Sequence, residues 1–394
     1  MKIKKLLLIS VGSFLVLIVN TGCYSKLPEE PAAFPTEVPR GILVDRIPSE
    51  ADVLFVSMRY VLGDPACLDD SNHTQDNFLD DPDCLREIYN PDLNVLASPR
   101  QLYALDIETD TAVQLTNLEC DFSSSKPIDS TRIMAPGMCS DTDGDGVIST
   151  KDKPEIFVLD LANKDIQCLT CGLALNGINN PDYSPVNQQF LFSAQWADKF
   201  HNYIFTLDWE GNLDQLTNTE EYMDFDCSWS EDGKKIVFNR LPEPFMTIPS
   251  EVWLMDATGI NLEQITEGGP NPNGEEPLGS YPMGIDADPD LSPDNSQIVF
   301  SRLRTGKHNE PFGIYELDVI DLNTKEITIL DSEHANMVPE WKEGGILFIR
   351  QTGSLDSWME RKQSVYLYRD GEFINLEPEF DEFPIGSNGA SWAR

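Results

Sequence analysis

The stretch DLSPDNSQIVFS, residues 290 to 301, decides the fold of this chain. A polar turn segment leads into a short apolar run, and two further runs follow it, IYELDVIDL at 314 to 322 and ITILD at 327 to 331. Short runs rich in β-branched and aromatic residues between turn residues are typical of strands. The turn segment and the three runs together predict one sheet of four antiparallel strands.

The same order of segments recurs along the chain. First runs stand at 53–57, 132–135, 190–193, 236–239, 298–301 and 346–349, second runs at 101–107, 155–161, 203–209, 251–257, 314–322 and 364–370, and third runs at 113–117, 166–170, 214–218, 263–267, 327–331 and 374–377. The repeat length of about 45 to 60 residues is the period of a propeller blade. We therefore expect an all-β protein, a six-bladed β-propeller of four-stranded antiparallel blades over residues 45–394.

The first blade lacks a turn segment of its own, and the C-terminal residues GSNGASWAR supply a candidate for it. Ser391 and Trp392 stand there as Ser228 and Trp229 stand in the fourth blade. A C-terminal strand paired with the first blade would close the ring and remove an open sheet edge. The alternative is a disordered tail.

The repeated pattern of Ser-Pro-Asp-Asn before Ile-Val-Phe, an Ile-Tyr or Val-Trp strand and a closing Gln-Leu-Thr or Gln-Ile-Thr resembles the TolB-like six-bladed propellers. The resemblance covers residues 45–394 and implies the fold. It does not choose a function, because the family contains periplasmic scaffold proteins, propellers attached to peptidases and sugar-degrading lyases.

The N-terminus reads as an export signal. Lysines precede an apolar run from Leu6 to Val19, which ends at Gly22-Cys23, so residues 1–22 resemble a bacterial lipoprotein signal peptide with Cys23 as the lipidated residue. Residues 23–44 then form the lipidated cysteine and a proline-rich tether. This predicts a lipid-anchored protein of the bacterial cell envelope that faces the periplasm or the exterior; the alternative is an ordinary cleaved signal.

The net charge of −39 excludes DNA and RNA as expected partners, because those partners require a basic surface. Counted with the turn segment as the innermost strand, each blade has four strands. In a propeller, the turn between the innermost strand and the first run and the turn between the second and third runs lie on one face. Those turns are short, whereas the long segments 58–100, 136–154, 241–250, 302–313 and 351–363 and the connections 171–181, 217–225 and 267–288 fall on the other face. Binding is expected on that loop-rich face, although loop growth without function is the alternative.

A calcium motif occupies residues 141–152, DTDGDGVISTKD. Its spacing matches the ligand positions of an EF-hand-type loop, with Gly146 at the sharp turn. The predicted ligands are Asp141, Asp143, Asp145, the Val147 carbonyl, Ser149 and Asp152. Asp152 stands where a longer Glu is usual, so bidentate binding is not assured. We expect calcium as a structural cofactor, with a metal-free acidic turn as the alternative.

Seven cysteines remain after Cys23, as expected in an oxidising compartment. The candidate disulfides are Cys67 with Cys84, Cys120 with Cys139 and Cys168 with Cys171, which leaves Cys227 unpaired. A single CxxC, as in Cys168 to Cys171, is weak evidence for redox or zinc chemistry.

Acidic residues gather where the innermost strands are expected to enter the central channel: Asp182, Asp224, Asp226, Asp286, Asp288 and Asp290. Asp226, Asp288 and Asp290 are candidate ligands for a second cation at the channel mouth. Turn chemistry repeated from blade to blade is the alternative explanation.

Two functions fit these features. One is a non-enzymatic scaffold that binds an envelope or extracellular protein, a peptide or a glycan. The other is a carbohydrate-active hydrolase or lyase with a site at the channel mouth, which carboxylates alone could support. Only four histidines are present, at 73, 201, 308 and 334, and no Gly-x-Ser-x-Gly motif appears, so we predict no catalytic residues. A contact between His308 or His334 and the channel carboxylates would favour the enzyme.

Overall fold

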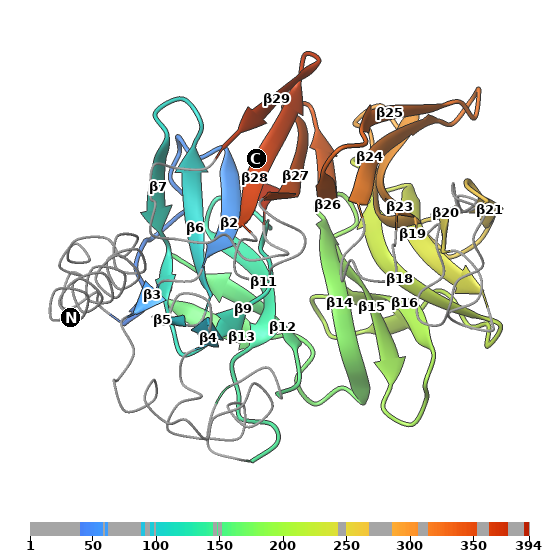
Figure 1. Cartoon of the computed structure of the whole chain (residues 1–394). Helices are drawn as coiled ribbons and strands as arrows, with labels where there is room; N and C mark the ends of the chain where they lie inside the picture. Colours follow the sequence, from blue (N-terminus) through green and yellow to red (C-terminus); the bar gives the residue numbers. More distant parts are fainter. Residues whose placement is uncertain are drawn as a thin grey trace, which may run out of the picture. The chain divides into compact units, whose positions relative to one another are not determined.

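The computed structural model describes residues 40–57, 60–61, 88–90, 95–97, 100–144, 148, 152–242, 250–267, 286–305, 314–352, 362–376 and 390–393. These residues belong to one compact unit that begins at Arg40. All of its regular elements are strands (Figure 1). Within the described part of the chain, no helix is long and apolar enough to cross a membrane.

Six antiparallel sheets form the ring of a propeller, as the repeat predicted (Figure 1). Each has four strand positions, and in blade II two short strands share the innermost position. In the order from the innermost strand outwards, blade I is β30 (Ser391–Trp392), β2 (Val53–Ser57), β6 (Gln101–Asp106) and β7 (Thr111–Gln114), and blade II is β9 (Asp121–Phe122) with β10 (Lys126–Pro127), β11 (Arg132–Met138), β12 (Glu155–Asp160) and β13 (Asp165–Cys168). Blade III is β14 (Leu175–Ser184), β15 (Gln189–Trp196), β16 (Asn202–Asp208) and β17 (Leu213–Gln215), and blade IV is β18 (Tyr222–Trp229), β19 (Lys235–Pro242), β20 (Glu251–Asp256) and β21 (Glu263–Gln264). Blade V is β22 (Asp286–Leu291), β23 (Gln297–Thr305), β24 (Ile314–Asp321) and β25 (Ile327–Asp331), and blade VI is β26 (Ala335–Lys342), β27 (Gly345–Thr352), β28 (Lys362–Arg369) and β29 (Glu372–Asn375).

The C-terminal strand closes the ring. In β30, Trp392 pairs with Val53 and Ser391 pairs with Leu54 of β2. The Ala393 amide donates a further hydrogen bond to the Asp52 carbonyl at 2.8 Å. The first and last parts of the folded chain therefore share one sheet, and blade I has no open inner edge.

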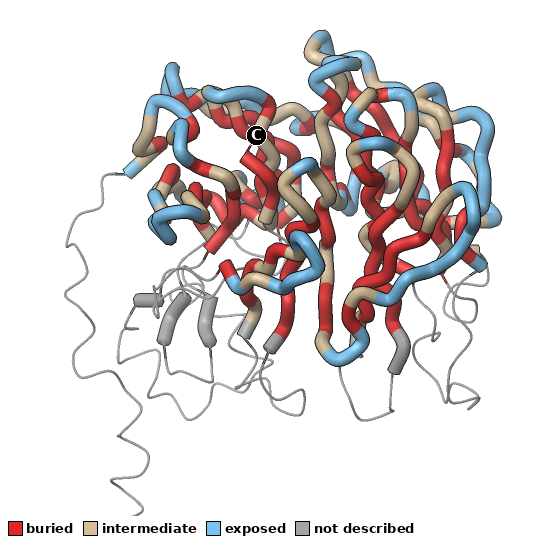
Figure 2. Tube along the Cα trace, turned by 90° about the horizontal axis from the view of Figure 1, so that it is seen from above, coloured by how far each residue is buried: buried red, intermediate tan, exposed pale blue. Residues whose placement is uncertain are grey.

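The hydrophobic core lies between neighbouring blades. One cluster joins Val237 and Leu254 of blade IV to Ile298 and Phe300 of blade V. Buried residues, red in Figure 2, follow the strands, whereas exposed residues gather at the turns. Each fully buried side chain of this size stabilises the fold by about 1.5–3 kcal/mol, so stacking of the middle strands against both neighbouring blades stabilises the ring.

The innermost strands are longer than the sequence suggested. The predicted connections 171–181, 217–225 and 267–288 in fact contain the first residues of β14, β18 and β22. These strands carry many polar residues because one face of them borders the channel rather than the core. They therefore lack the apolar signal by which the middle strands could be recognised.

Two small sheets complete the fold. β1 (Gly41–Ile42) pairs with β8 (Thr116–Asn117), so strand pairing begins ahead of the predicted boundary at residue 45. In the long insertion of blade I, β5 (Val95–Ala97) pairs with β3 (Tyr60–Val61) and with β4 (Ile88–Asn90). Cys67 and Cys84 lie outside the described residues, as does Cys23.

Candidate functional site at the central channel

Every blade contributes to a narrow cavity of about 60 Å³ at the centre of the propeller. The residues that line it are Ser124 to Lys126, Asn180 to Asp182, Asp226 to Ser228, Asp288 to Asp290, Val338 to Glu340, and Ala390. These residues lie on or directly beside the innermost strands, so the strands that the sequence did not delimit form the walls of the channel.

A β-bulge recurs at one position of four successive innermost strands. The bulge lies between Asn179 and Asp182 in β14, between Phe225 and Ser228 in β18, between Ala287 and Asp290 in β22, and between Met337 and Glu340 in β26. The bulged residues have left-handed backbones: φ is 41° at Asn180, 45° at Asp226, 50° at Asp288 and 52° at Val338. Asn and Asp tolerate this conformation, whereas it is strained for a β-branched residue such as Val. The bulge places these four side chains at the channel wall.

Two of the bulged residues form a carboxylate pair. The amide of Asn180 donates to Asp226 Oδ1 at 2.6 Å and to Asp288 Oδ1 at 3.4 Å, so one amide bridges both acids. Asp226 also accepts from the Asn239 amide at 3.2 Å, and Asp288 accepts from the Val338 backbone N–H at 3.2 Å. Burial, together with the charge of Asp288, raises the pKa of Asp226 to about 8. Burial raises the pKa of Asp288 to about 6.

The structure separates Asp290 from this pair, although the sequence grouped the three as ligands. Asp290 accepts hydrogen bonds from the Ser228 hydroxyl and, at 2.7 Å, from the Trp341 backbone N–H. Asp182 likewise accepts from the Trp229 backbone N–H of the next blade at 2.7 Å. Asp182 and Asp290 therefore join adjacent blades, whereas Asp226 and Asp288 share the Asn180 amide; all four acids line the same cavity.

Basic side chains neutralise part of the acidic channel near one end. Lys126 Nζ lies 3.6 Å from Asp182 Oδ1 and 3.5 Å from Glu340 Oε1. Burial opposes the charge of Lys126, but the neighbouring carboxylates, Asp182 foremost, outweigh it and raise the pKa of Lys126. Lys342 also faces this group, and its pKa is raised in the same way, with Asp290 as the main cause. Asp182 and Asp290 were expected at the channel, but Lys126, Glu340 and Lys342 were not, because the members of this cluster come from blades II, III, V and VI.

A wider cavity of about 660 Å³ opens from this cluster to the face that carries the short turns. Its walls include the turn residues Ser130, Pro185 and Glu231 and the aromatic rings of Trp229 and Trp392. We call it the channel mouth. The loops of the opposite face lie mostly outside the described residues, so the expectation that they bind a partner stays a prediction.

Two buried ion pairs occupy the other end of the same innermost strands. Arg240 donates to Asp224 at 2.7 and 3.0 Å, and Arg302 donates to Asp286 at 2.6 and 3.0 Å. Arg240 also lies over the ring of Trp253, 4.9 Å from its centroid. Asp224 and Asp286, which the sequence grouped with the channel acids, thus have a structural partner one strand away.

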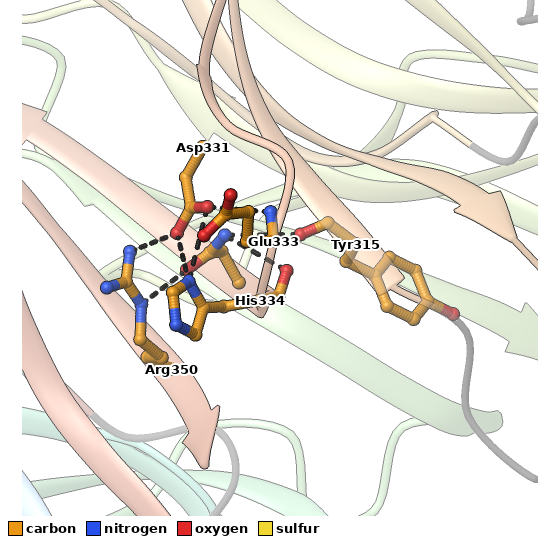
Figure 3. A network of polar contacts seen from close by, with 6 residues as sticks. Tyr315, Asp331, Glu333, His334 and Arg350 are labelled. Carbon is orange, nitrogen blue, oxygen red and sulfur yellow. Dashed lines mark hydrogen bonds and ion pairs between the residues drawn. The ribbon is translucent and has the colours of Figure 1, made fainter. Parts of the chain in front are cut away.

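His334 lies in a polar network at the junction of blades V and VI (Figure 3). Its Nδ1 is 2.9 Å from Asp331 Oδ2, and the same carboxylate accepts a hydrogen bond from Arg350. Arg350 Nε donates to Asn336 Oδ1 at 2.9 Å. His334 has Asp331 as its partner and is not among the residues that line the channel cavity, so His334 does not make the contact that would have favoured an enzyme. His308 lies outside the described residues.

Part of the calcium motif is described, and its geometry suits a hard cation. Carboxylate oxygens of Asp141, Asp143 and Asp152 lie within 4.8 Å of one another. The Gly144 N–H donates to Asp141 Oδ1 at 2.7 Å, which folds the first turn of the loop. Asp152 is 3% exposed and accepts from the Thr142 N–H at 2.6 Å. Asp145, Val147 and Ser149 lie outside the described residues.

The structure contains two disulfides among its described residues, Cys120 with Cys139 and Cys168 with Cys171, both of which the sequence suggested. Cys227 is buried and unpaired, and burial raises the pKa of its thiol. It therefore behaves as a core residue.

Solved structures with the same arrangement of blades include TolB from Acinetobacter baumannii, with a TM-score of 0.54, 16% identity and coverage of 88% of this chain and 68% of that one. A putative TolB from Agrobacterium tumefaciens gives a TM-score of 0.52 and 16% identity over 73% of this chain and 96% of that one. The fold is that of a TolB-like six-bladed β-propeller. Oligogalacturonate lyase from Vibrio parahaemolyticus is more distant, with a TM-score of 0.44 and 13% identity over 65% of this chain and 70% of that one. No protein-family model and no curated protein matches the sequence.

Proposed function

We propose that this TolB-like propeller is a binding scaffold of the bacterial envelope that takes a basic group of a protein or peptide partner into its channel. The observation that carries the proposal is the carboxylate pair of Asp226 and Asp288, which one amide bridges. Among the described residues, neither acid forms an ion pair with a basic side chain, although Lys126 lines the same cavity.

The pair is costly to the fold, which argues for a role in binding. Two carboxylates that share a poorly solvated site repel each other, and desolvation disfavours their charged forms. Asp224 and Asp286 show that the same strands accommodate fully paired acids two positions away. Acids with strongly perturbed pKa values concentrate at functional sites.

The chemistry of the channel mouth selects among the expected partner classes. Lys126 and Lys342 are engaged by Asp182, Asp290 and Glu340, so the negative charge left deeper in the channel is that of the Asp226 and Asp288 pair. With pKa values of about 8 and about 6, the pair carries about one negative charge near pH 7 and about two above pH 8. An acidic glycan would meet charge of its own sign there. A lysine or arginine side chain, or an N-terminal amine, would supply the missing positive charge, while Trp229 and Trp392 offer apolar contact to the rest of a peptide.

A capture experiment with matched baits tests this function. Wild-type mature protein, the Asp226→Asn/Asp288→Asn variant and the exposed control Asp198→Asn would each be incubated with envelope extract in the presence of calcium. We expect a specific partner with wild type and control, its loss with the double variant, and its release by free arginine. A partner that the double variant retains would contradict the channel as the binding site.

Lipid anchoring is a separate part of the proposal and rests on the Gly22-Cys23 signal. Wild-type protein expressed in a bacterial host should be found with the membranes, and Cys23→Ser should be released into the soluble fraction. Wild type that is already soluble after processing would contradict the anchor.

Calcium binding is proposed as a stabilising feature of blade II. The three described carboxylates and the short hydrogen bonds that orient Asp141 and Asp152 support it. A ligand present at about 100 times its Kd stabilises the folded state by about 2.7 kcal/mol. We expect a chelator to lower the thermal midpoint of wild type and of the control Asp165→Asn, but not of Asp141→Asn/Asp143→Asn. A chelator-insensitive wild type would rule the cofactor out.

A further inference from the structure

The CxxC segment, Cys168 to Cys171, forms an accessible disulfide at the loop-rich end of blade II. Cys168 is the last residue of β13, and Cys171 lies in the connection to blade III. Cys171 is exposed and Cys168 is partly exposed. A thiolate from solution or from another protein can therefore reach the bond.

Hydrogen bonds hold this segment in place independently of the disulfide. The Leu169 N–H donates to the Ile156 carbonyl at 2.8 Å, and the Leu173 N–H donates to the Thr170 carbonyl at 3.0 Å. The fully buried Thr170 hydroxyl accepts from the Ile156 N–H at 2.9 Å and donates to Glu155. Breaking the disulfide leaves these contacts intact, so reduction should not unfold the blade.

One contact distinguishes the two sulfur atoms. The backbone N–H of Cys171 donates to Cys168 Sγ at 3.0 Å. A hydrogen bond from an amide stabilises a thiolate, and a thiolate that is stabilised leaves more readily in disulfide exchange. Cys171 is thus the more exposed residue of the two, and the Cys168 thiolate is the better leaving group.

The other disulfide of the same blade is built differently. Cys120 is 5% exposed and packs in a hydrophobic cluster with Phe122. It links Cys139 across 19 residues, whereas the CxxC bond spans three. A cross-link that closes a longer loop restricts the unfolded chain more strongly. Cys120 with Cys139 is therefore the stabilising bond, and it serves as an internal control.

We propose that Cys168 and Cys171 form a site of thiol–disulfide exchange with a dithiol partner, a property separate from partner binding in the channel. A partner thiolate attacks Cys171 Sγ, the bond between the two sulfurs breaks, and its electron pair passes to Cys168 Sγ. The second partner thiol then attacks the partner's own sulfur in the mixed disulfide and releases Cys171. The propeller disulfide is reduced to two thiols, which take up the two protons, while the partner dithiol is oxidised to a disulfide.

Differential alkylation of the native mature protein tests the proposal. The protein would be equilibrated in mixtures of reduced and oxidised dithiothreitol, alkylated and analysed by peptide mass spectrometry. We expect Cys168 and Cys171 to become labelled at a reduced-to-oxidised ratio at least tenfold lower than Cys120 and Cys139 require, with unchanged circular dichroism. Reduction of both disulfides at the same ratio, or only together with unfolding, would overturn the proposal.

A second measurement tests the order of the steps. Under a limiting amount of reduced glutathione, wild-type protein should carry the mixed disulfide on Cys171 in preference to Cys168. The Cys168→Ser/Cys171→Ser variant should fold with the same circular dichroism and acquire no glutathione at this segment. Equal modification of the two cysteines, or none, would contradict the assigned roles.

Discussion

Two acids on one strand, two residues apart, have opposite surroundings in this propeller. In β18, Asp224 is 1% exposed and accepts two hydrogen bonds from Arg240, whereas Asp226 lies beside Asp288 of the next blade in the channel cavity. In β22, Asp286 and Asp288 repeat the same contrast. The presence or absence of an arginine on the next strand of the same blade therefore separates acids that are paired within their blade from acids that face the channel cavity.

The largest effect is expected from breaking the arginine-paired end. Asp224→Ala would leave the Arg240 guanidinium buried against aromatic rings without its carboxylate. Removal of one partner from a buried pair costs about 3–5 kcal/mol of unfolding free energy. Urea unfolding at pH 7 measures this loss of unfolding free energy. Asp224→Ala/Arg240→Met should recover much of the lost unfolding free energy. If the unfolding free energy of Asp224→Ala lies within about 1 kcal/mol of wild type, which is close to the effect of a surface substitution, the pair has no structural role.

The channel acid should respond in the opposite direction. Because the pKa of Asp226 is raised to about 8 in the folded state, the folded protein retains a proton that the unfolded chain has lost, so its stability should fall as the pH rises from about 4 to about 8. Asp226→Asn removes that charge and should stabilise the fold by about 1–2 kcal/mol at pH 8 and hardly at pH 4. Thermal unfolding across this pH range measures the effect, with Asp198→Asn as control. A destabilised variant at pH 8 would mean that the folded site already compensates the charge.

The smallest effect is expected at the bulge itself. Val338 occupies the position of Asn180, Asp226 and Asp288 with φ of 52°, a conformation that a β-branched residue adopts only under strain. Val338→Asn should relieve this strain and add about 1 kcal/mol of stability. Urea unfolding measures the gain, with Val338→Ala as the control that changes size without adding the tolerance of Asn for this conformation. An Asn variant no more stable than the Ala variant would contradict the strain.

The sequence predicted those parts of the molecule whose signal is local. The run from Ile298 to Ser301 is apolar because it is buried on both faces, and its copies fixed the number of blades. The pairing of Trp392 with Val53 could be inferred because Ser391-Trp392 copies Ser228-Trp229. The calcium motif was visible because its candidate ligands stand in one loop.

The channel could be predicted only in part, because its residues meet through the ring and not along the chain. Lys126 and Glu340 are brought together from blades II and VI, and neither stands in a motif. The acids of β18 and β22 were visible as a group, but their division depends on Arg240 and Arg302 on the adjacent strands. The bulge that places Asp226 at the wall and Asp290 against the next blade has no sequence signature in polar strands.

Direct titration of a basic peptide tests the central claim, which is that the Asp226 and Asp288 pair receives a positive group. Isothermal titration calorimetry at pH 8 would compare the pentapeptide Gly-Gly-Arg-Gly-Gly with the same peptide containing uncharged citrulline. We expect the arginine peptide to bind wild type and Asp198→Asn, to bind Asp226→Asn at least tenfold more weakly, and the citrulline peptide not to bind. Equal binding of the arginine peptide to wild type and Asp226→Asn, or no binding to wild type, would contradict it.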